Sequence, residues 1–471
     1  MPAVSLESLA VETIGEILSH LIESSFWDCM EDSLHKDDTE TILRSSRAVA
    51  QARQTITAPV SRRYRQAALL QSDLWRHIVF TVSPKQDLFD TILRIHHENQ
   101  SRAGTLGLRI ICNLEDASTA VQQCASAVLS SLLPKTSSLI LVLPLLDNHS
   151  YPSFSLNFEP FATKRLVQMA VVHRGSPWHT PNPWAEKCIP TIPNLRWYRG
   201  NAYSTRGNRN LRYLHLGNIM LTHLMRMISG SPVLESIHVR TVYTNDAAIP
   251  PHLIHHKLSI VHIGSLDTEF FTHVTLPALR VLDCTLKYPD HIQAGKSWPE
   301  GPEYSNAVDF IQRSNCKLTS LSVGYNLFGP SLVDILKNQN ELESLELRTP
   351  ERWLIEMGQD ARVDPLAIKY LSAPNVPKLR DLSIVMDCKN ATSLKEALES
   401  RLHVETVAKL DTLEVMVTGL QGKYSRPEMS DLEKVFGEYE DMGVLVYVQN
   451  YGRRQTQCGD MGENQFVEEF F

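Results

Sequence analysis

Three histidines stand at the same place in a repeated seven-residue phrase of this sequence. His215, His238 and His262 each precede the last apolar residue of a copy, and Asp283 takes that place in the next copy. If the phrases form neighbouring strands, these side chains lie in one row at a spacing of about 4.8 Å. Such a row would bind an acidic or phosphorylated ligand, bind a metal, or respond to pH near the ordinary histidine pKa. The simpler interpretation, which we favour, is a polar strand face without a metal.

The repeated phrase reads x-L-x-x-L-x-L and occurs eight times. Its last two apolar positions lie two residues apart, as on one face of a strand. Successive copies begin 23, 24, 21, 39, 24, 37 and 31 residues apart, and several of these steps match the period of about 20 to 29 residues of leucine-rich repeats. We therefore predict an α/β solenoid with parallel strands. The copies are Asn210–Leu216, Val233–Val239, Lys257–Ile263, Ala278–Cys284, Lys317–Val323, Glu341–Leu347, Lys378–Ile384 and Lys409–Val415.

Segments between the phrases supply the other elements of each predicted repeat. Helical spacing of apolar residues occurs at Ile219–Ile228, Ser331–Lys337 and Ser393–Leu402. We expect the two most obvious insertions, Lys287–Asn315 and Arg348–Pro377, to be loops, because the strands must keep their register. Prolines, which end helices and favour extended chain, stand two residues before a first leucine at Pro193, Pro232, Pro277 and Pro377.

Less regular relatives flank the eight copies. Before them, we expect strand-like segments at Leu106–Leu114, Lys164–Val171 and Asn194–Gly200. After them, Ser430–Asp441 is typical of a helix and Val444–Val448 of a closing strand. This last pair would cap the array.

Bulk composition places the chain among soluble globular proteins, with 43% hydrophobic and 21% charged residues. A formal charge of -7 gives no general attraction to nucleic acid. The eight cysteines form no C-x-x-C pair, and we expect reduced thiols. The most apolar run, Leu139–Leu146, is far shorter than the ~20 residues of a membrane helix, and the first residues lack the basic segment of a secretory signal. We predict a cytoplasmic or nuclear location and no contact with a membrane.

Catalytic motifs are missing from the sequence. It contains no G-x-x-x-x-G-K-[ST], G-x-G-x-x-G, H-E-x-x-H or G-x-S-x-G. We therefore predict recognition without catalysis and without a cofactor. The alternative is a hydrolase or other enzyme with a site in the irregular region Asn148–Tyr203, where coupled titratable groups would be required. In the same region, Trp178 and Trp184 either form a binding platform or pack against the first repeats.

The first eighty residues have the pattern of a small helical module. One group of residues, in an amphipathic helix over Ser5–Leu21, is Leu9, Ala10, Val11, Glu12, Ile14 and Ile17. A second group, in a basic and aromatic helix over Val60–Ile78, is Val60, Arg62, Arg63, Tyr64, Ala67, Leu74 and Trp75. Together they resemble the F-box, in the fungal form that is followed by leucine-rich repeats. The chain departs from that pattern in Ala10, where proline is usual, in Tyr64, where tryptophan is usual, and in a longer stretch between the groups.

The resemblance implies a specificity subunit of an SCF-type ubiquitin ligase. In that family the box docks onto the Skp-family adaptor, and the repeats hold the protein that is ubiquitinated. The adaptor contacts that it implies, each with the box's internal core as the alternative, are Leu9, Val11, Ile14, Leu18, Leu21, Val60, Tyr64, Leu74 and Trp75. The candidates for target contact are His215, His238, His262, Asp283, Arg212, Arg280, Glu346, Trp178 and Trp184.

The expected organisation has four parts. An all-α F-box-like domain at 1–80 precedes a connecting region with the first irregular repeats at 81–163. The degenerate leucine-rich repeat solenoid follows at 164–450, and a disordered tail at 451–471. A rival function is a repeat scaffold whose divergent box binds no ligase, and Ala10 and the long stretch between the groups motivate it.

Overall fold

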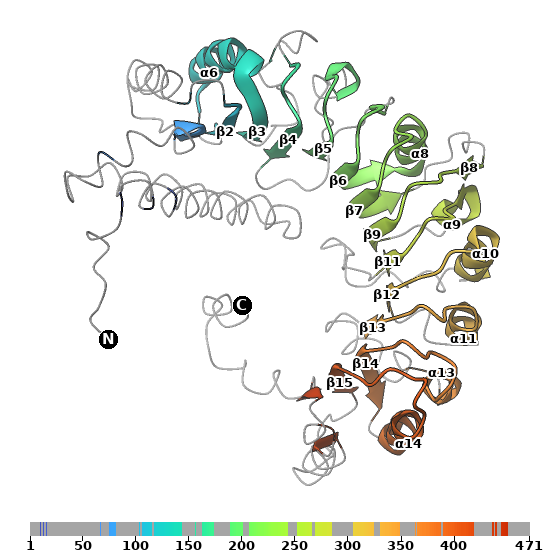
Figure 1. The fold of residues 1–471 in the computed structure, drawn as a ribbon. Helices are drawn as coiled ribbons and strands as arrows, with labels where there is room; N and C mark the ends of the chain where they lie inside the picture. The colour runs from blue at the N-terminus through green and yellow to red at the C-terminus, as the bar shows by residue number, and fades with distance from the viewer. Residues whose placement is uncertain are drawn as a thin grey trace, which may run out of the picture. The chain divides into compact units, whose positions relative to one another are not determined.

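A computed structural model describes most of the repeat region and little of the N-terminal module. The described residues are 75–81, 106–114, 117–143, 163–173, 189–200, 207–243, 252–265, 269–284, 305–324, 330–348, 365–387, 390–418 and 444–450, with the single positions 10, 13, 16, 66, 103, 156, 363, 436, 437 and 439. The chain divides into two compact units, Met1–Leu234 and Glu235–Phe471. Both are α/β arrangements with parallel strands (Figure 1).

The strands of the first unit each pair in parallel with the next strand along the chain. They are β1 (His77–Thr81), β2 (Leu108–Asn113), β3 (Thr136–Leu143), β4 (Gln168–His173), β5 (Trp197–Gly200) and β6 (Tyr213–Met220). Between them lie helix α6 (Thr119–Leu132), the 3-10 turns η2 (Leu133–Lys135) and η3 (Ile189–Thr191), and helix α8 (Leu221–Ser229). The strand-like segments expected before the eight phrases thus contain β2 and β5 and overlap β4, which continues beyond Val171 to His173.

Both faces of the first unit's central strand are buried. In β3 every residue from Ser138 to Leu143 is buried, which requires cover on both sides because successive side chains point to opposite faces. Helix α6 begins at Thr119, and the Ser118 side chain accepts a hydrogen bond from Val121 N at 3.5 Å as its N-cap. The continuous apolar sequence of β3 fits this two-sided burial.

The second unit repeats one arrangement from strand to strand. Its main sheet has the parallel order β7 (Ser236–Tyr243), β9 (Ile260–Ser265), β11 (Val281–Cys284), β12 (Ser320–Gly324), β13 (Ser344–Arg348), β14 (Asp381–Asp387), β15 (Thr412–Thr418) and β16 (Leu445–Asn450). The helices α9 (Glu269–His273), α10 (Ser305–Ser314), α11 (Pro330–Leu336), α13 (Pro365–Tyr370) and α14 (Ala391–Leu402) lie along one side of these strands (Figure 1). The short strands β8 (Leu253–Ile254) and β10 (Val274–Thr275) form a separate parallel pair.

The register of the second unit places the repeated leucines side by side. Val261 of β9 lies opposite Leu282 of β11, which lies opposite Leu321 of β12. The row continues through β13, β14 and β15 at Leu345, Leu382 and Leu413, and all of its members are at most 2% exposed. The last apolar position of each phrase, such as Val323, is buried on the same side because it follows by two residues. The predicted parallel strands are confirmed in all eight phrases.

Three expectations about the elements were wrong. The two insertions expected as loops contain helices α10 and α13. In α10 the buried residues Ala307, Phe310 and Ile311 follow helical spacing, so the segment has its own inward face. Strand β6 continues to Met220, where a helix was expected from Ile219. Strand β1 begins at His77, where the N-terminal helix was expected to continue to Ile78.

At several places a buried polar side chain joins the turn before one strand to the turn before the preceding strand. Gln339 is 1% exposed, and its Oε1 accepts a hydrogen bond from Leu318 N at 2.8 Å, while its Nε2 donates to Cys316 O at 3.3 Å. Ser314 Oγ accepts from Leu276 N at 3.0 Å in the same way. These bonds satisfy backbone groups that would be costly to bury alone. The same role is filled elsewhere by Asn208, Ser231 and Arg401.

Candidate functional site

The candidate site is the polar strand face of the second unit. His238 of β7 lies opposite His262 of β9, and His262 lies opposite Asp283 of β11. Beyond Asp283 the same row continues across the sheet through Ser322, Glu346, Ser383, Glu414 and Tyr447. Apart from Ser322, which is 7% exposed, these side chains are half-buried or exposed. The predicted row of polar positions is therefore confirmed in this unit.

The first end of the row is a cluster of two histidines and one carboxylate. The rings of His238 and His262 stack with centroids 5.6 Å apart and an interplanar angle of 28°. His262 Nδ1 lies 3.1 Å from Asp283 Oδ2, and the two side chains are 30% and 32% exposed. The carboxylate fixes the orientation of the His262 ring and leaves Nε2 as its other hydrogen-bonding atom. Within the described ranges, no group of three potential ligands is arranged to hold a metal ion.

His215, the third histidine expected in this row, lies on β6 of the first unit. It lies opposite Arg199 of β5 and is only 3% exposed. Residues at the same level of that sheet, Ile140 and Ala170, are fully buried. The expectation of an exposed histidine was therefore wrong, because the phrase alone does not show whether a strand's outer face is covered. Arg212, at the start of β6, is exposed.

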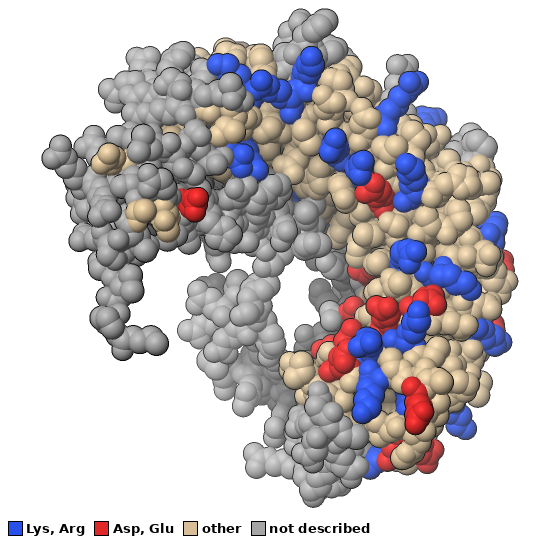
Figure 2. Space-filling model, in the orientation of Figure 1, with Lys and Arg blue, Asp and Glu red and all other residues tan. Residues whose placement is uncertain are grey.

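The other end of the row carries most of the face's carboxylates. Glu346 lies opposite Ser383, whose Oγ donates a hydrogen bond to Glu414 Oε2 at 2.7 Å. One residue before strands β14 and β15, Arg380 Nη1 pairs with Asp411 Oδ2 at 3.2 Å. Figure 2 shows acidic side chains gathered near strands β12 to β15, with basic side chains more widely spread over the described surface. Basic and acidic side chains are not fully separated in this unit, since Arg280 is exposed near its beginning while Arg380 stands among the carboxylates.

Two exposed apolar residues extend this face, and sequence reasoning missed them. Leu445 is 60% exposed and lies opposite Thr412, while Tyr447 is 52% exposed and lies opposite Glu414. The alternation of Leu445 and Tyr447 with Val446 and Val448 was available in the sequence as a signal of which side chains point outward.

Most of the residues implied by the F-box resemblance lie outside the described residues. Trp75 is described: it ends a helical segment two residues before β1 and is 7% exposed. It therefore occupies a core position, which was the alternative to adaptor contact for this residue. Outside the described residues lie Leu9, Val11, Ile14, Leu18, Leu21, Val60, Tyr64, Leu74, Trp178 and Trp184.

Comparisons with known proteins assign no family. No family model matches the sequence, and no curated protein matches it. Among solved structures, a protein from Bacteroides fragilis aligns over 87% of this chain and 82% of its own length, at 11% identity and a TM-score of 0.22. Those values are too low to transfer a fold or a function. Among the described helices, none combines the length and the apolar character that crossing a membrane requires.

Proposed function

We propose that this chain is the substrate-recognition subunit of an SCF-type ubiquitin ligase. In this proposal, an N-terminal F-box binds the Skp-family adaptor, and a leucine-rich repeat solenoid binds the target protein. The transfer chemistry belongs to other subunits, and this chain acts in the cytoplasm or nucleus without a cofactor.

The observation that supports the proposal is the continuous polar row on the second unit. Its members come from consecutive strands in unbroken register, with the repeated leucines buried on the other side. A wide face of this kind offers many side chains to a macromolecule, as expected for an array of repeats. The two ends of the face differ in their side chains. The stacked pair His238 and His262 lies at one end, and the carboxylates around Glu346 lie toward the other. Electrostatic complementarity of this type sets the orientation of a partner.

Adaptor binding is tested with full-length protein and the Skp-family adaptor. Leu18→Asp is expected to abolish co-purification, because a charge is placed on the apolar side of the first predicted helix. Thr13→Asp is the matched control, since Thr13 is exposed on a helical segment. Capture of the adaptor by the Leu18→Asp protein at wild-type yield, with an unchanged circular dichroism spectrum, would contradict the proposal. Failure of the wild-type protein to capture the adaptor would favour the rival function, a scaffold whose divergent box binds no ligase.

Target binding is tested by affinity capture in the presence of a proteasome inhibitor. The double substitution of Glu346 and Glu414 by lysine is expected to lose proteins that the wild type captures, because it reverses the charge of the acidic end of the row. The matched control replaces Glu396 and Glu405 by lysine, since both are exposed and lie outside the strands. Equal loss in both variants would show a nonspecific charge effect and would count against this face.

The histidine row is a separate hypothesis within the same function. Replacement of His215, His238 and His262 together by glutamine is expected to change target capture if the row contacts the target. Because His215 is buried, a second variant that changes only His238 and His262 separates lost contact from lost folding. If this double variant captures the target as the wild type does, the hypothesis that the histidine row contacts the target is wrong, and the row is an ordinary polar face.

A further inference from the structure

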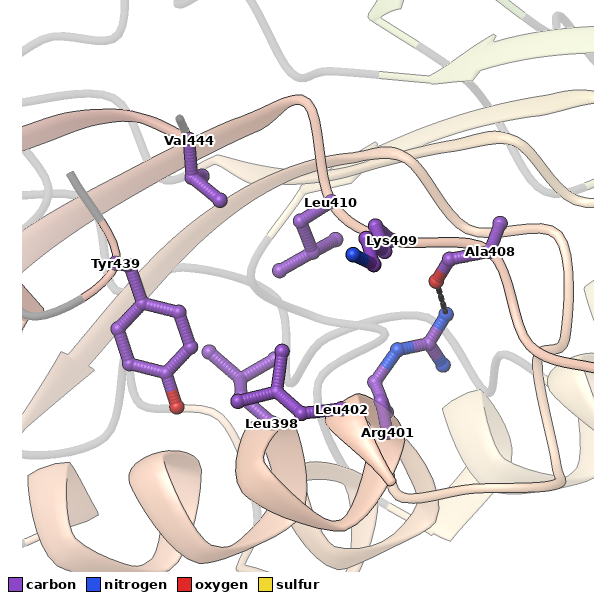
Figure 3. A pocket seen from close by; sticks show the side chains of 8 residues that line it. All are labelled: Leu398, Arg401, Leu402, Ala408, Lys409, Leu410, Tyr439 and Val444. Carbon is purple, nitrogen blue, oxygen red and sulfur yellow. Dashed lines mark hydrogen bonds between the residues drawn. The ribbon is translucent and has the colours of Figure 1, made fainter. Parts of the chain in front are cut away.

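A pocket of about 260 Å³ lies at the C-terminal end of the second unit. It is bounded by helix α14, by the turn that leads into β15, and by the residues just before β16 (Figure 3). Its lining residues are Leu398, Arg401, Leu402, Ala408, Lys409, Leu410, Tyr439 and Val444. None of the candidate residues on the polar strand face is among them.

Most of the pocket wall is apolar. Leu398 and Leu402 enter from α14, and Leu410 enters from the turn before β15 (Figure 3). Tyr439 is 2% exposed, and its hydroxyl donates to the Lys395 carbonyl oxygen at 3.4 Å. With the hydroxyl engaged on the helix, the ring contributes an apolar surface to the pocket. The wall therefore suits an aliphatic or aromatic group.

The polar part of the wall is cationic. Arg401 and Lys409 lie on one side of the pocket, with Tyr439 and Val444 across from them (Figure 3). Among the described residues, no aspartate or glutamate lines the pocket. Lys409 is exposed, whereas Arg401 is 5% exposed. An occupant that meets this wall faces the two positive charges of Arg401 and Lys409.

Arg401 is a buried charge held by neutral acceptors. Its Nη1 donates to the carbonyl oxygens of Leu371 at 3.2 Å and Val376 at 2.9 Å, and its Nη2 donates to those of Leu379 at 3.1 Å and Ala408 at 3.4 Å. Its Nε, which is also buried, has no hydrogen-bond acceptor among the described residues. Burial lowers the Arg401 pKa to about 10, so the guanidinium is still charged at neutral pH. A buried cation whose described hydrogen-bond partners are all neutral carbonyl groups is stabilised by an anion beside it.

We propose that this pocket binds a small apolar carboxylate, with its carboxylate against Arg401 and Lys409 and its apolar part against Leu398, Leu402 and Tyr439. Charge-assisted hydrogen bonds orient the carboxylate, and burial of the apolar part supplies affinity. A cationic ligand of the same shape would face two like charges. A neutral ligand would leave Arg401 uncompensated. The proposal does not rest on ligase function, since none of the pocket's lining residues belongs to the F-box-like segment 1–80 or to the polar strand face.

The test uses isothermal titration calorimetry of the full-length protein with three probes that share one alkyl chain: octanoate, octan-1-ol and octylamine. We expect saturable binding of octanoate with a stoichiometry of one, and much weaker binding of the alcohol and the amine. Octanoate is also expected to raise the unfolding temperature, because a ligand that binds only the folded state stabilises it. Absence of saturable octanoate binding, or equal affinity for octan-1-ol, would overturn the proposal.

Two variants locate the binding to this pocket. Lys409→Gln is expected to weaken octanoate binding by roughly tenfold, as the loss of one charge-assisted contact implies. Its matched control is Lys369→Gln, which removes an exposed lysine from α13 and is expected to bind octanoate like the wild type. Leu402→Trp is expected to block binding by filling the pocket. If Leu402→Trp fails to fold, the Lys409→Gln comparison still decides, and unchanged affinity in that variant would refute the site.

Discussion

Gln339→Leu is expected to loosen the turn before β12 in a measurable way. The substitution keeps a side chain of similar length but removes the acceptor for Leu318 N and the donor to Cys316 O, both of which are buried contacts. The first bond, at 2.8 Å, has good geometry, and leaving such an amide unpaired costs about 1–3 kcal/mol. The second, at 3.3 Å, is longer, and its loss costs about 1 kcal/mol or less. Burial of the leucine returns about 1 kcal/mol, so the net destabilisation is about 2 kcal/mol.

The effect is expected to be local, because each strand of this sheet pairs only with the strands on either side of it. A loss of about 2 kcal/mol corresponds to a roughly thirtyfold larger opening constant. Hydrogen exchange of the peptide that contains Leu318 should therefore become faster, and that of a peptide from β15 should stay unchanged. Gln312→Leu is the matched control: Gln312 is exposed on α10, and its replacement should change stability by no more than about 0.5 kcal/mol. Unaltered exchange at Leu318 in Gln339→Leu would refute this account of the turns.

Three further outcomes are expected. Iodoacetamide at pH 9 should label the exposed Cys124 and spare Cys112. Burial raises the Cys112 pKa to about 12, which keeps this side chain in the unreactive thiol form. Mass spectrometry of the labelled native protein checks this. Trp75→Ala should lower the free energy of unfolding by about 3–5 kcal/mol in a denaturant titration, because a buried indole leaves a cavity before β1. Ser383→Ala should lower it by less than about 1 kcal/mol, since one half-buried hydrogen bond to Glu414 is lost, and a larger loss would mean that this bond organises the acidic end.

The strands of this chain were predictable because their signal is local. Spacing of two between the last apolar residues fixes which side of a strand faces inward, and the phrase length fixes the register, so Val261, Leu282 and Leu321 meet as expected. The row that contains His262 and Asp283 follows from the same spacing.

Other features depended on information that is not local. His215 has the same sequence context as His238, but it is buried because of what covers its strand. Arg401 stands at the end of an ordinary amphipathic helix, where an exposed arginine is the usual expectation, yet the carbonyl groups of two turns surround it. The pocket beside it was not predicted, since its shape depends on how Tyr439 and Val444 pack against Leu398–Leu410, which the sequence pattern does not show.

The buried bonds between successive turns make the modules of this chain non-interchangeable. Gln339 fits the backbone of the turn at Cys316, whereas Ser314 fits the amide of Leu276, and neither side chain would reach the other's partner in the same way. Deleting or transplanting one module would place two turns side by side whose side chains and backbone groups do not match. A buried amide or carbonyl would then lose its hydrogen-bond partner. Each of these hydrogen bonds is therefore specific to the two turns that it joins. A substitution that alters the backbone of one turn requires a compensating substitution in the side chain that the other turn supplies.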